Sequence, residues 1–192
     1  MNKTKKYKII YADPPWSYQD KKCNGNAQDH YPTQSLGWIK SLGGGVQKIV
    51  DKDCVLFLWA TYPLLPEALE VIKAWGFEYK SIAFQWVKLN KKNGKPFYGL
   101  GRWTRGNTEA CLLAVRGKPK RVSNSVFQLI FSPIENHSKK PQEAREKIVK
   151  LIGDVPRLEL FARNTGEKNL FGKNPLDGWD TWGDEVKNSI EL

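Results

Sequence analysis

Short apolar runs separated by polar segments form the hydrophobic pattern of this 192-residue chain. Two runs, residues 7–12 and 54–59, are continuously apolar and rich in β-branched and aromatic side chains, as in strands covered on both faces. Further strands are predicted at residues 77–89, 109–115 and 157–162. Apolar residues at helical spacing predict helices at residues 36–42, 65–75 and 141–152. This alternation predicts an α/β fold with a mostly parallel central sheet flanked by helices, in a single domain over residues 1–192.

Glycine and polar residues divide these elements. The triplet Gly43-Gly44-Gly45 is expected to end the first helix, and it lacks the preceding strand that a phosphate-binding loop requires. Two long polar segments, residues 17–31 and 91–107, are predicted to be loops that contact substrate. Residues 123–133 are apolar but aperiodic, so the pattern assigns them no element.

The first strand delivers a carboxylate into a rigid turn. Asp13 follows the apolar run, and Pro14 and Pro15 forbid its continuation because neither can donate to the sheet ladder. We expect the nearby carbonyls to lack local N–H partners, so that Asp13 and a carbonyl together grip an amino group. Trp16 is expected to be exposed and to stack on a base. An ordinary proline-rich turn with a surface tryptophan is the alternative.

Charge points to a polyanionic partner. The net charge is +11 with a pI near 9.5, which suits nucleic acid, although solubility alone would also be served. No apolar run approaches the ~20 residues of a membrane span. Three cysteines without paired spacing and two histidines make a metal site hard to assemble, and they favour a reducing cytoplasm.

Basic and aromatic residues are interleaved in the two polar loops, as phosphate contacts combined with base stacking require. The predicted nucleic-acid contacts are Tyr18, Lys21, Lys22, Tyr31, Lys91, Lys92, Arg102, Trp103 and Arg105. Residues 118–120 add a further basic segment.

An ordered set of motifs extends from residue 7 to residue 185. It comprises Asp13-Pro14-Pro15-Trp16 after a strand, His30-Tyr31-Pro32, Leu58-Trp59, Glu109 with Cys111-Leu112-Leu113 and Arg116-Gly117, His137-Ser138-Lys139-Lys140-Pro141, and Leu158-Glu159-Leu160-Phe161-Ala162-Arg163. In these motifs the chain resembles the MT-A70 family of adenine-N6 methyltransferases, in a compact bacterial or phage form. The resemblance implies a Rossmann-like domain that uses S-adenosylmethionine, with the catalytic motif preceding the cofactor-binding segments.

The resemblance also implies roles for single residues. Asp13 and the Pro14 carbonyl would hold the adenine amine, with Pro15 and Trp16 stacked on the extruded base. Cofactor contacts would come from Asp13, Lys140, Glu159, Arg163, Asn164 and Asp184, with Lys140 on the methionine carboxylate and Arg163 near the ribose. Without the resemblance, Lys140 would be a solvated lysine, Glu159 an outward strand residue and Arg163 a surface ion-pair partner.

The function expected from these features is S-adenosylmethionine-dependent methylation of adenine N6 in DNA. RNA is the nearest alternative substrate, because the 2′-hydroxyl contact that separates the two cannot be located in the sequence. A non-catalytic nucleic-acid-binding scaffold is a second alternative, and cytosine-N4 methylation a third. The sequence leaves a monomer and a homodimer equally open.

Overall fold

A computed structural model describes residues 5–17, 33–99, 101, 103–135, 139–163 and 176–192 of the chain. Its centre is a seven-stranded sheet in the order β5-β3-β4-β2-β1-β6-β7. The strands are β1 (Tyr7–Ala12), β2 (Val50–Ala60), β3 (Glu78–Leu89), β4 (Thr108–Arg116), β5 (Leu129–Pro133), β6 (Arg157–Leu160) and β7 (Asp180–Trp182). The helices are α1 (Leu36–Ser41), α2 (Gly43–Ile49), α3 (Leu65–Ala74) and α4 (Gln142–Ile152), with a short 3-10 turn, η2, at Tyr62–Leu64.

The sheet is mostly parallel, as the sequence predicts. β1 pairs in parallel with β2 and β6, β6 with β7, and β3 with β5, whereas β4 pairs antiparallel with both of its neighbours. Six strands therefore point one way and β4 points the other. As a result, the amino-terminal end of β4 lies at the same edge of the sheet as the carboxyl-terminal ends of the other six.

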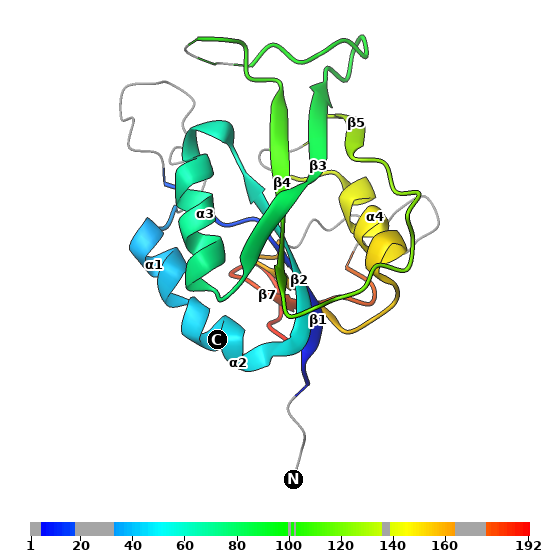
Figure 1. Ribbon diagram of the computed structural model, residues 1–192. Coiled ribbons are helices and arrows are strands. Elements are labelled where there is room, and N and C mark those ends of the chain that lie inside the picture. Colours follow the sequence, from blue (N-terminus) through cyan, green and yellow to red (C-terminus); the bar gives the residue numbers. More distant parts are fainter. Residues whose placement is uncertain (1–4, 18–32, 100, 102, 136–138, 164–175) are drawn as a thin grey trace.

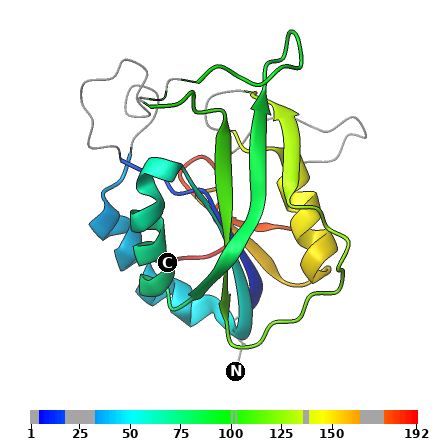
Figure 2. The same cartoon turned by 45° about the horizontal axis from the view of Figure 1, so that its top comes forward.

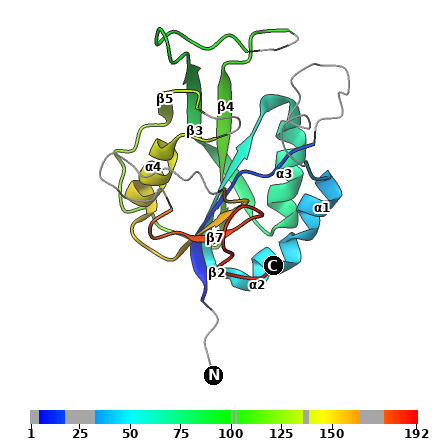
Figure 3. The ribbon, with the colours of Figure 1, turned by 180° about the vertical axis from the view of Figure 1, so that it is seen from behind.

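Helices cover both faces of the sheet, with α1, α2 and α3 on one side and α4 on the other (Figures 1 and 3). Along β1 the side chains alternate between two cores. Ile10 and Ala12 lie in the core with residues of α1, α2 and α3, and Ile9 and Tyr11 lie in the core with residues of α4. This two-sided burial is the reason that the strand reads as a continuous apolar run.

The first helix, α1, ends at Ser41, just before Gly43-Gly44-Gly45 as expected, but the glycines do not interrupt helical structure, because α2 begins at Gly43. The glycines serve close packing instead. A Cβ on Gly43 would lie 2.5 Å from the carbonyl oxygen of Ala74, and one on Gly45 would crowd Leu192. Only glycine lets the start of α2 approach the end of α3 so closely.

The sequence pattern does not predict two of the strands. β5 lies in the segment that the pattern left unassigned, and β7 is not predicted at all. Both are short strands at opposite edges of the sheet, and in β5 the exposed residues Leu129 and Phe131 are apolar, so the sequence shows no alternation of apolar and polar positions. No helix in the described part of the chain is long and apolar enough to cross a membrane. Cys54 and Cys111 are free, buried thiols.

Candidate active site

Asp13 lies where the strand order reverses. Strand β1 pairs with β2 on one side and with β6 on the other. The strands that follow β1 in the chain, β2 to β5, lie on the β2 side, and the last two, β6 and β7, lie on the opposite side. In open α/β sheets the crevice beyond the carboxyl ends of the strands at such a point is where ligands bind. Arg163 and Asp184 follow β6 and β7 at the same edge, so three predicted site residues share it.

A row of four alternating charges crosses this edge. Lys140 Nζ lies 2.8 Å from Asp13 Oδ2 and 3.4 Å from Glu109 Oε2, and Lys88 Nζ lies 2.6 Å from Glu109 Oε1. The exposed fractions of these side chains run from 10% for Lys140 to 23% for Asp13. At this burial the charges are weakly screened by solvent, so they hold one another in place.

Glu109 enters the row because β4 is antiparallel. It lies at the beginning of β4, opposite Trp86 of β3, and therefore at the edge where the parallel strands end. Sequence reasoning matched Glu109 to a family motif but gave it no role in the site. The missing information was the direction of β4, because a parallel strand would place Glu109 at the far edge.

Two tryptophans lie beneath the lysines. Lys140 Nζ is 5.7 Å from the ring centroid of Trp59, and Lys88 Nζ is 5.1 Å from that of Trp86. Trp59 donates from its indole nitrogen to the hydroxyl of Tyr11 at 2.7 Å, which fixes the orientation of its ring. The aromatic faces attract the ammonium groups and keep them directed along the edge.

The row moves the two carboxyl pKa values apart. Burial raises the pKa of Asp13, a rise that Lys140 only partly opposes. Burial also acts to raise the pKa of Glu109, but Lys140 and Lys88 outweigh it and hold that pKa below its usual value. Glu109 is therefore a firmly ionised partner of the lysines, while Asp13 keeps more affinity for a proton.

The Pro14 carbonyl does have a local partner, contrary to expectation. The backbone N–H of Trp16 donates to it at 2.8 Å, and the N–H of Gln34 donates to the Pro15 carbonyl at 2.8 Å. The reason is that the turn folds back on itself within two residues. A carbonyl oxygen has two lone pairs, and the bond from Trp16 uses one of those on Pro14.

The expected exposure of Trp16 is also wrong, since its exposed fraction is 7%. Its indole nitrogen donates to the Trp59 carbonyl at 3.0 Å, and its ring lies in the core with α1, α2 and α3. The side chain is drawn inward because burying a large apolar ring is favourable once its N–H finds an acceptor. Pro15, by contrast, is half-exposed.

Lys140 and Arg163 lie near Asp13, and Asp184 is exposed. The charge of Arg163 acts to lower the pKa of Asp13, which places its guanidinium within electrostatic range. Phe161, two residues before Arg163, has a φ of 60°, in the left-handed region that is costly for a bulky side chain. Its ring packs against Trp182 at 5.6 Å, and this packing supports the strained turn.

Glu159 is buried, not outward-facing. Both of its carboxylate oxygens accept from Arg145, at 2.7 Å and 2.5 Å, and the Arg145 guanidinium lies 5.4 Å from the Tyr11 ring centroid. This bidentate pair raises the pKa of Arg145 against the effect of burial. These contacts support a structural role for Glu159 in joining α4 to β6, whereas its contact with the cofactor stays a prediction.

The loop between β3 and β4 projects beyond the site edge (Figures 1 and 2). On it, Lys91, Lys92, Trp103 and Arg105 are all exposed, as nucleic-acid contacts require. Six further predicted residues lie outside the described part of the chain: Tyr18, Lys21, Lys22, Tyr31, Arg102 and Asn164. Among the described residues, no group of three or more His, Cys, Asp or Glu side chains is placed to hold a metal ion.

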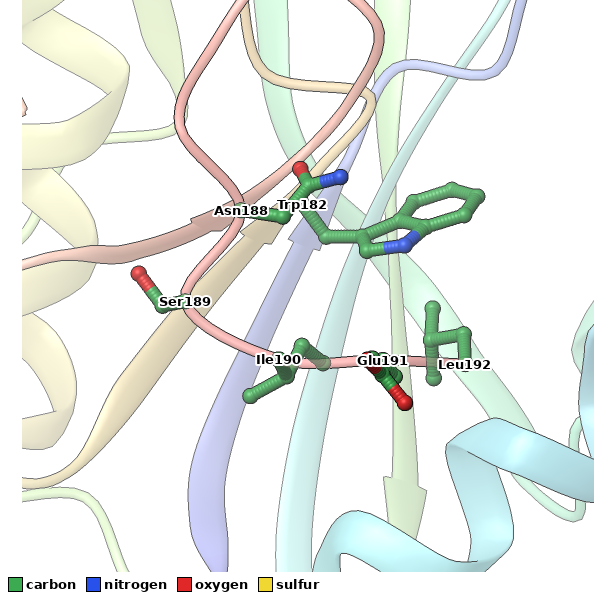
Figure 4. Close-up of a pocket in the computed structure, with 6 residues that line it drawn as sticks. All are labelled: Trp182, Asn188, Ser189, Ile190, Glu191 and Leu192. Atoms are coloured by element: carbon green, nitrogen blue, oxygen red, sulfur yellow. The ribbon is translucent and has the colours of Figure 1, made fainter.

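A pocket is lined by Trp182 and by the carboxyl-terminal residues 188–192 (Figure 4). None of the four residues of the charged row lines it. Ile190 and Leu192 pack against the core that contains α1, α2 and α3, and Trp182 stacks on Trp38 at 6.4 Å. This end of the chain thus completes the packing around β7.

Comparison with known proteins gives a consistent result. The MT-A70 family model matches residues 7–185. The Type II methyltransferase M.MunI of Mycoplasma sp is 34% identical over 209 residues, which cover 98% of this chain and 82% of that protein. An N(6)-adenosine-methyltransferase MT-A70-like protein of Arabidopsis thaliana is 26% identical over 96% of this chain but only 24% of its own length. An N6-methyladenosine RNA methyltransferase of Cryphonectria parasitica is 26% identical over 94% of this chain and 52% of its own length. The chain therefore belongs to the MT-A70 family.

Proposed function

We propose that this protein transfers a methyl group from S-adenosylmethionine to the N6 amine of adenine in DNA. The observation that carries the proposal is the half-buried ion pair of Asp13 and Lys140 at the reversal point of the sheet. A carboxylate with a raised pKa at the end of a strand is suited to an amine that gives up a proton.

The residues at the edge fit the amino-acid end of S-adenosylmethionine, which carries one ammonium and one carboxylate. Lys140 and Arg163 supply positive charge for the carboxylate, and Asp13 supplies negative charge for the ammonium. The cofactor supplies an electrophilic methyl group on a sulfonium sulfur. An exposed Asp184 after β7 stands at the same edge for the ribose.

Asp13 and Pro14 would act on the adenine amine. One amine hydrogen would donate to the Asp13 carboxylate and the other to the second lone pair of the Pro14 carbonyl. Holding both hydrogens turns the nitrogen lone pair out of the ring, toward the methyl group. As the carbon–nitrogen bond formed, the methyl–sulfur bond would break and leave a neutral thioether, and the nitrogen would give up a proton to the Asp13 carboxylate.

Of the two residues expected to stack on the base, Pro15 and Trp16, we assign that role to Pro15 alone. Pro15 is half-exposed beside Asp13, whereas Trp16 is buried and hydrogen-bonded to Trp59. Pro15 would therefore cover one face of the base, and Trp16 would support the turn from below. Removal of Trp16 would disturb the site through the turn.

DNA is proposed over RNA because M.MunI, which resembles this chain over most of both lengths, is named a Type II methyltransferase. RNA is the second candidate, since relatives covered over a smaller part of their length are named for adenosine or RNA methylation. The test is methyl transfer from labelled S-adenosylmethionine to matched DNA and RNA of the same sequences. Labelling confined to RNA would reject the DNA proposal, and labelling of neither, with no cofactor binding by calorimetry, would favour a non-catalytic scaffold.

A further inference from the structure

Trp103 is the most exposed large apolar side chain of the described residues, with an exposed fraction of 99%. An indole of this size carries roughly 150–250 Å² of surface that gains free energy when it is removed from water. Trp103 lies on the loop that joins the end of β3, where Lys88 lies, to the start of β4, where Glu109 lies. This loop extends beyond the edge of the sheet at which Asp13 lies (Figure 2).

The base of this loop is held by backbone hydrogen bonds. The N–H of Lys88 donates to the Asn107 carbonyl at 2.8 Å, and the N–H of Phe97 donates to the Lys88 carbonyl at 2.8 Å. Leu89 and Pro96 form an antiparallel bridge. The position of the outer loop is thus set by the same strands that set the charged row.

The outer part of the loop is narrow because glycines let its two sides approach. A Cβ on Gly99 would overlap the carbonyl oxygen of Gly106, and one on Gly101 would overlap that of Thr104. The Arg105 guanidinium lies 4.6 Å from the ring centroid of Tyr98 and joins the two sides through a cation–π contact. Trp103 is therefore carried at the end of a thin, closed projection.

We infer that Trp103 is the wedge that enters the base stack of duplex DNA when the target adenine is extruded. The inference rests on the proposed function. Apolar side chains inserted between base steps unstack them, and an extruded base leaves a gap that a flat ring can fill. Arg105, Lys91 and Lys92 lie on the same loop, are exposed, and supply positive charge for contacts with the phosphates.

The experiment compares paired with unpaired targets. A site is first located by mapping adenines methylated by the wild type, and two duplexes are then made, with the target adenine opposite thymine or opposite an abasic position. Trp103→Ala should lower kcat/KM on the paired duplex at least about tenfold, because unpairing costs a few kcal/mol. On the abasic duplex the loss should shrink to roughly threefold or less, since that cost is already removed. Trp103→Phe should retain most of the activity on both.

Phe127→Ala is the matched control. Phe127 is also exposed, at 81%, but it precedes β5 and lies away from the site edge, so its removal should change neither rate. An equal loss by Trp103→Ala on both duplexes, or no loss on either, would overturn the wedge while leaving the proposed function intact. Failure of the wild type to methylate DNA at all would instead reject the proposed function, and the wedge with it.

Discussion

At the scale of single residues, the site depends on how two carboxylates share Lys140. Asp13 and Glu109 both contact its ammonium, yet burial dominates at Asp13 and the two lysines dominate at Glu109. One carboxylate is thereby suited to exchange a proton and the other to remain charged. Substitution of each should therefore have a different effect.

Asp13→Asn should reduce methyl transfer by about 10²–10⁴-fold, because the amide cannot accept the amine proton. It should leave the free energy of unfolding unchanged or slightly higher. The raised pKa of Asp13 means that its ionised form opposes folding near neutral pH, and asparagine removes that charge. Labelled methyl transfer and urea unfolding measure the two effects, and a fully active variant would remove Asp13 from the mechanism.

Glu109→Gln should move the acidic limb of the kcat/KM profile to lower pH. The negative charge of Glu109 acts to raise the pKa of Asp13, and its removal also leaves Lys140 to pair with Asp13 alone. Both changes favour the ionised form of Asp13. Glu78→Gln, at the exposed start of β3, is the control and should not shift the limb. If the acidic limb of Glu109→Gln stayed in place or moved to higher pH, the electrostatic coupling between Glu109 and Asp13 would be contradicted.

At the scale of elements, α4 is joined to β6 by a buried ion pair. Arg145 of α4 and Glu159 of β6 form two hydrogen bonds, with exposed side-chain fractions of 10% and 7%. Because α4 directly follows Lys140, this pair also sets where the lysine enters the site. The packing of α4 on β6 therefore helps to position Lys140 beside Asp13.

Arg145→Met should lower the free energy of unfolding by about 3–5 kcal/mol, since it leaves the Glu159 carboxylate buried without a partner. Replacing both residues, Arg145→Met with Glu159→Leu, should recover most of that stability. Urea denaturation measures both variants. The exposed pair of Lys40 and Glu70, 2.9 Å apart, is the control, and Lys40→Met should cost under about 1 kcal/mol. A cost for Arg145→Met as small as the control would show that the pair is not buried in solution.

The sequence predicts correctly those elements whose burial gives a simple pattern of apolar residues. β1 and β2 are read correctly because both faces are buried, and α4 because its apolar positions recur at helical spacing. Gly43 misled the prediction because a glycine that permits close packing and a glycine that ends a helix look alike in sequence. Trp16 misled it because its burial depends on the Trp59 carbonyl, which lies on another strand.

At the scale of the whole molecule, the positive charge and the loop beyond the edge of the sheet serve the same partner. The net charge is +11, and the exposed loop between β3 and β4 carries Lys91, Lys92 and Arg105 next to the candidate site. Composition indicated nucleic acid, but only the sheet topology brings this loop to the edge that holds Asp13. The direction of β4, which no local pattern encodes, is the feature that sequence alone could not supply.

The logarithm of the DNA-binding constant should fall linearly with the logarithm of the salt concentration. Replacing Lys91, Lys92 and Arg105 together by alanine should make the slope shallower by roughly 0.9 for each phosphate that the variant no longer neutralises. Binding isotherms at several salt concentrations measure the slope. Lys73→Ala, exposed at the end of α3 remote from the loop, should leave the slope unchanged. Equal slopes in all three proteins would place the DNA on another surface.

The central claim is that Asp13 directs methylation of adenine N6 in DNA. The most direct measurement maps modified bases in DNA from cells that express either the wild type or Asp13→Asn, in a host without other adenine methylation. We expect N6-methyladenine at a recurring sequence with the wild type and none with the variant. DNA free of N6-methyladenine in cells that express the folded wild type, or equal methylation with both proteins, would contradict the claim.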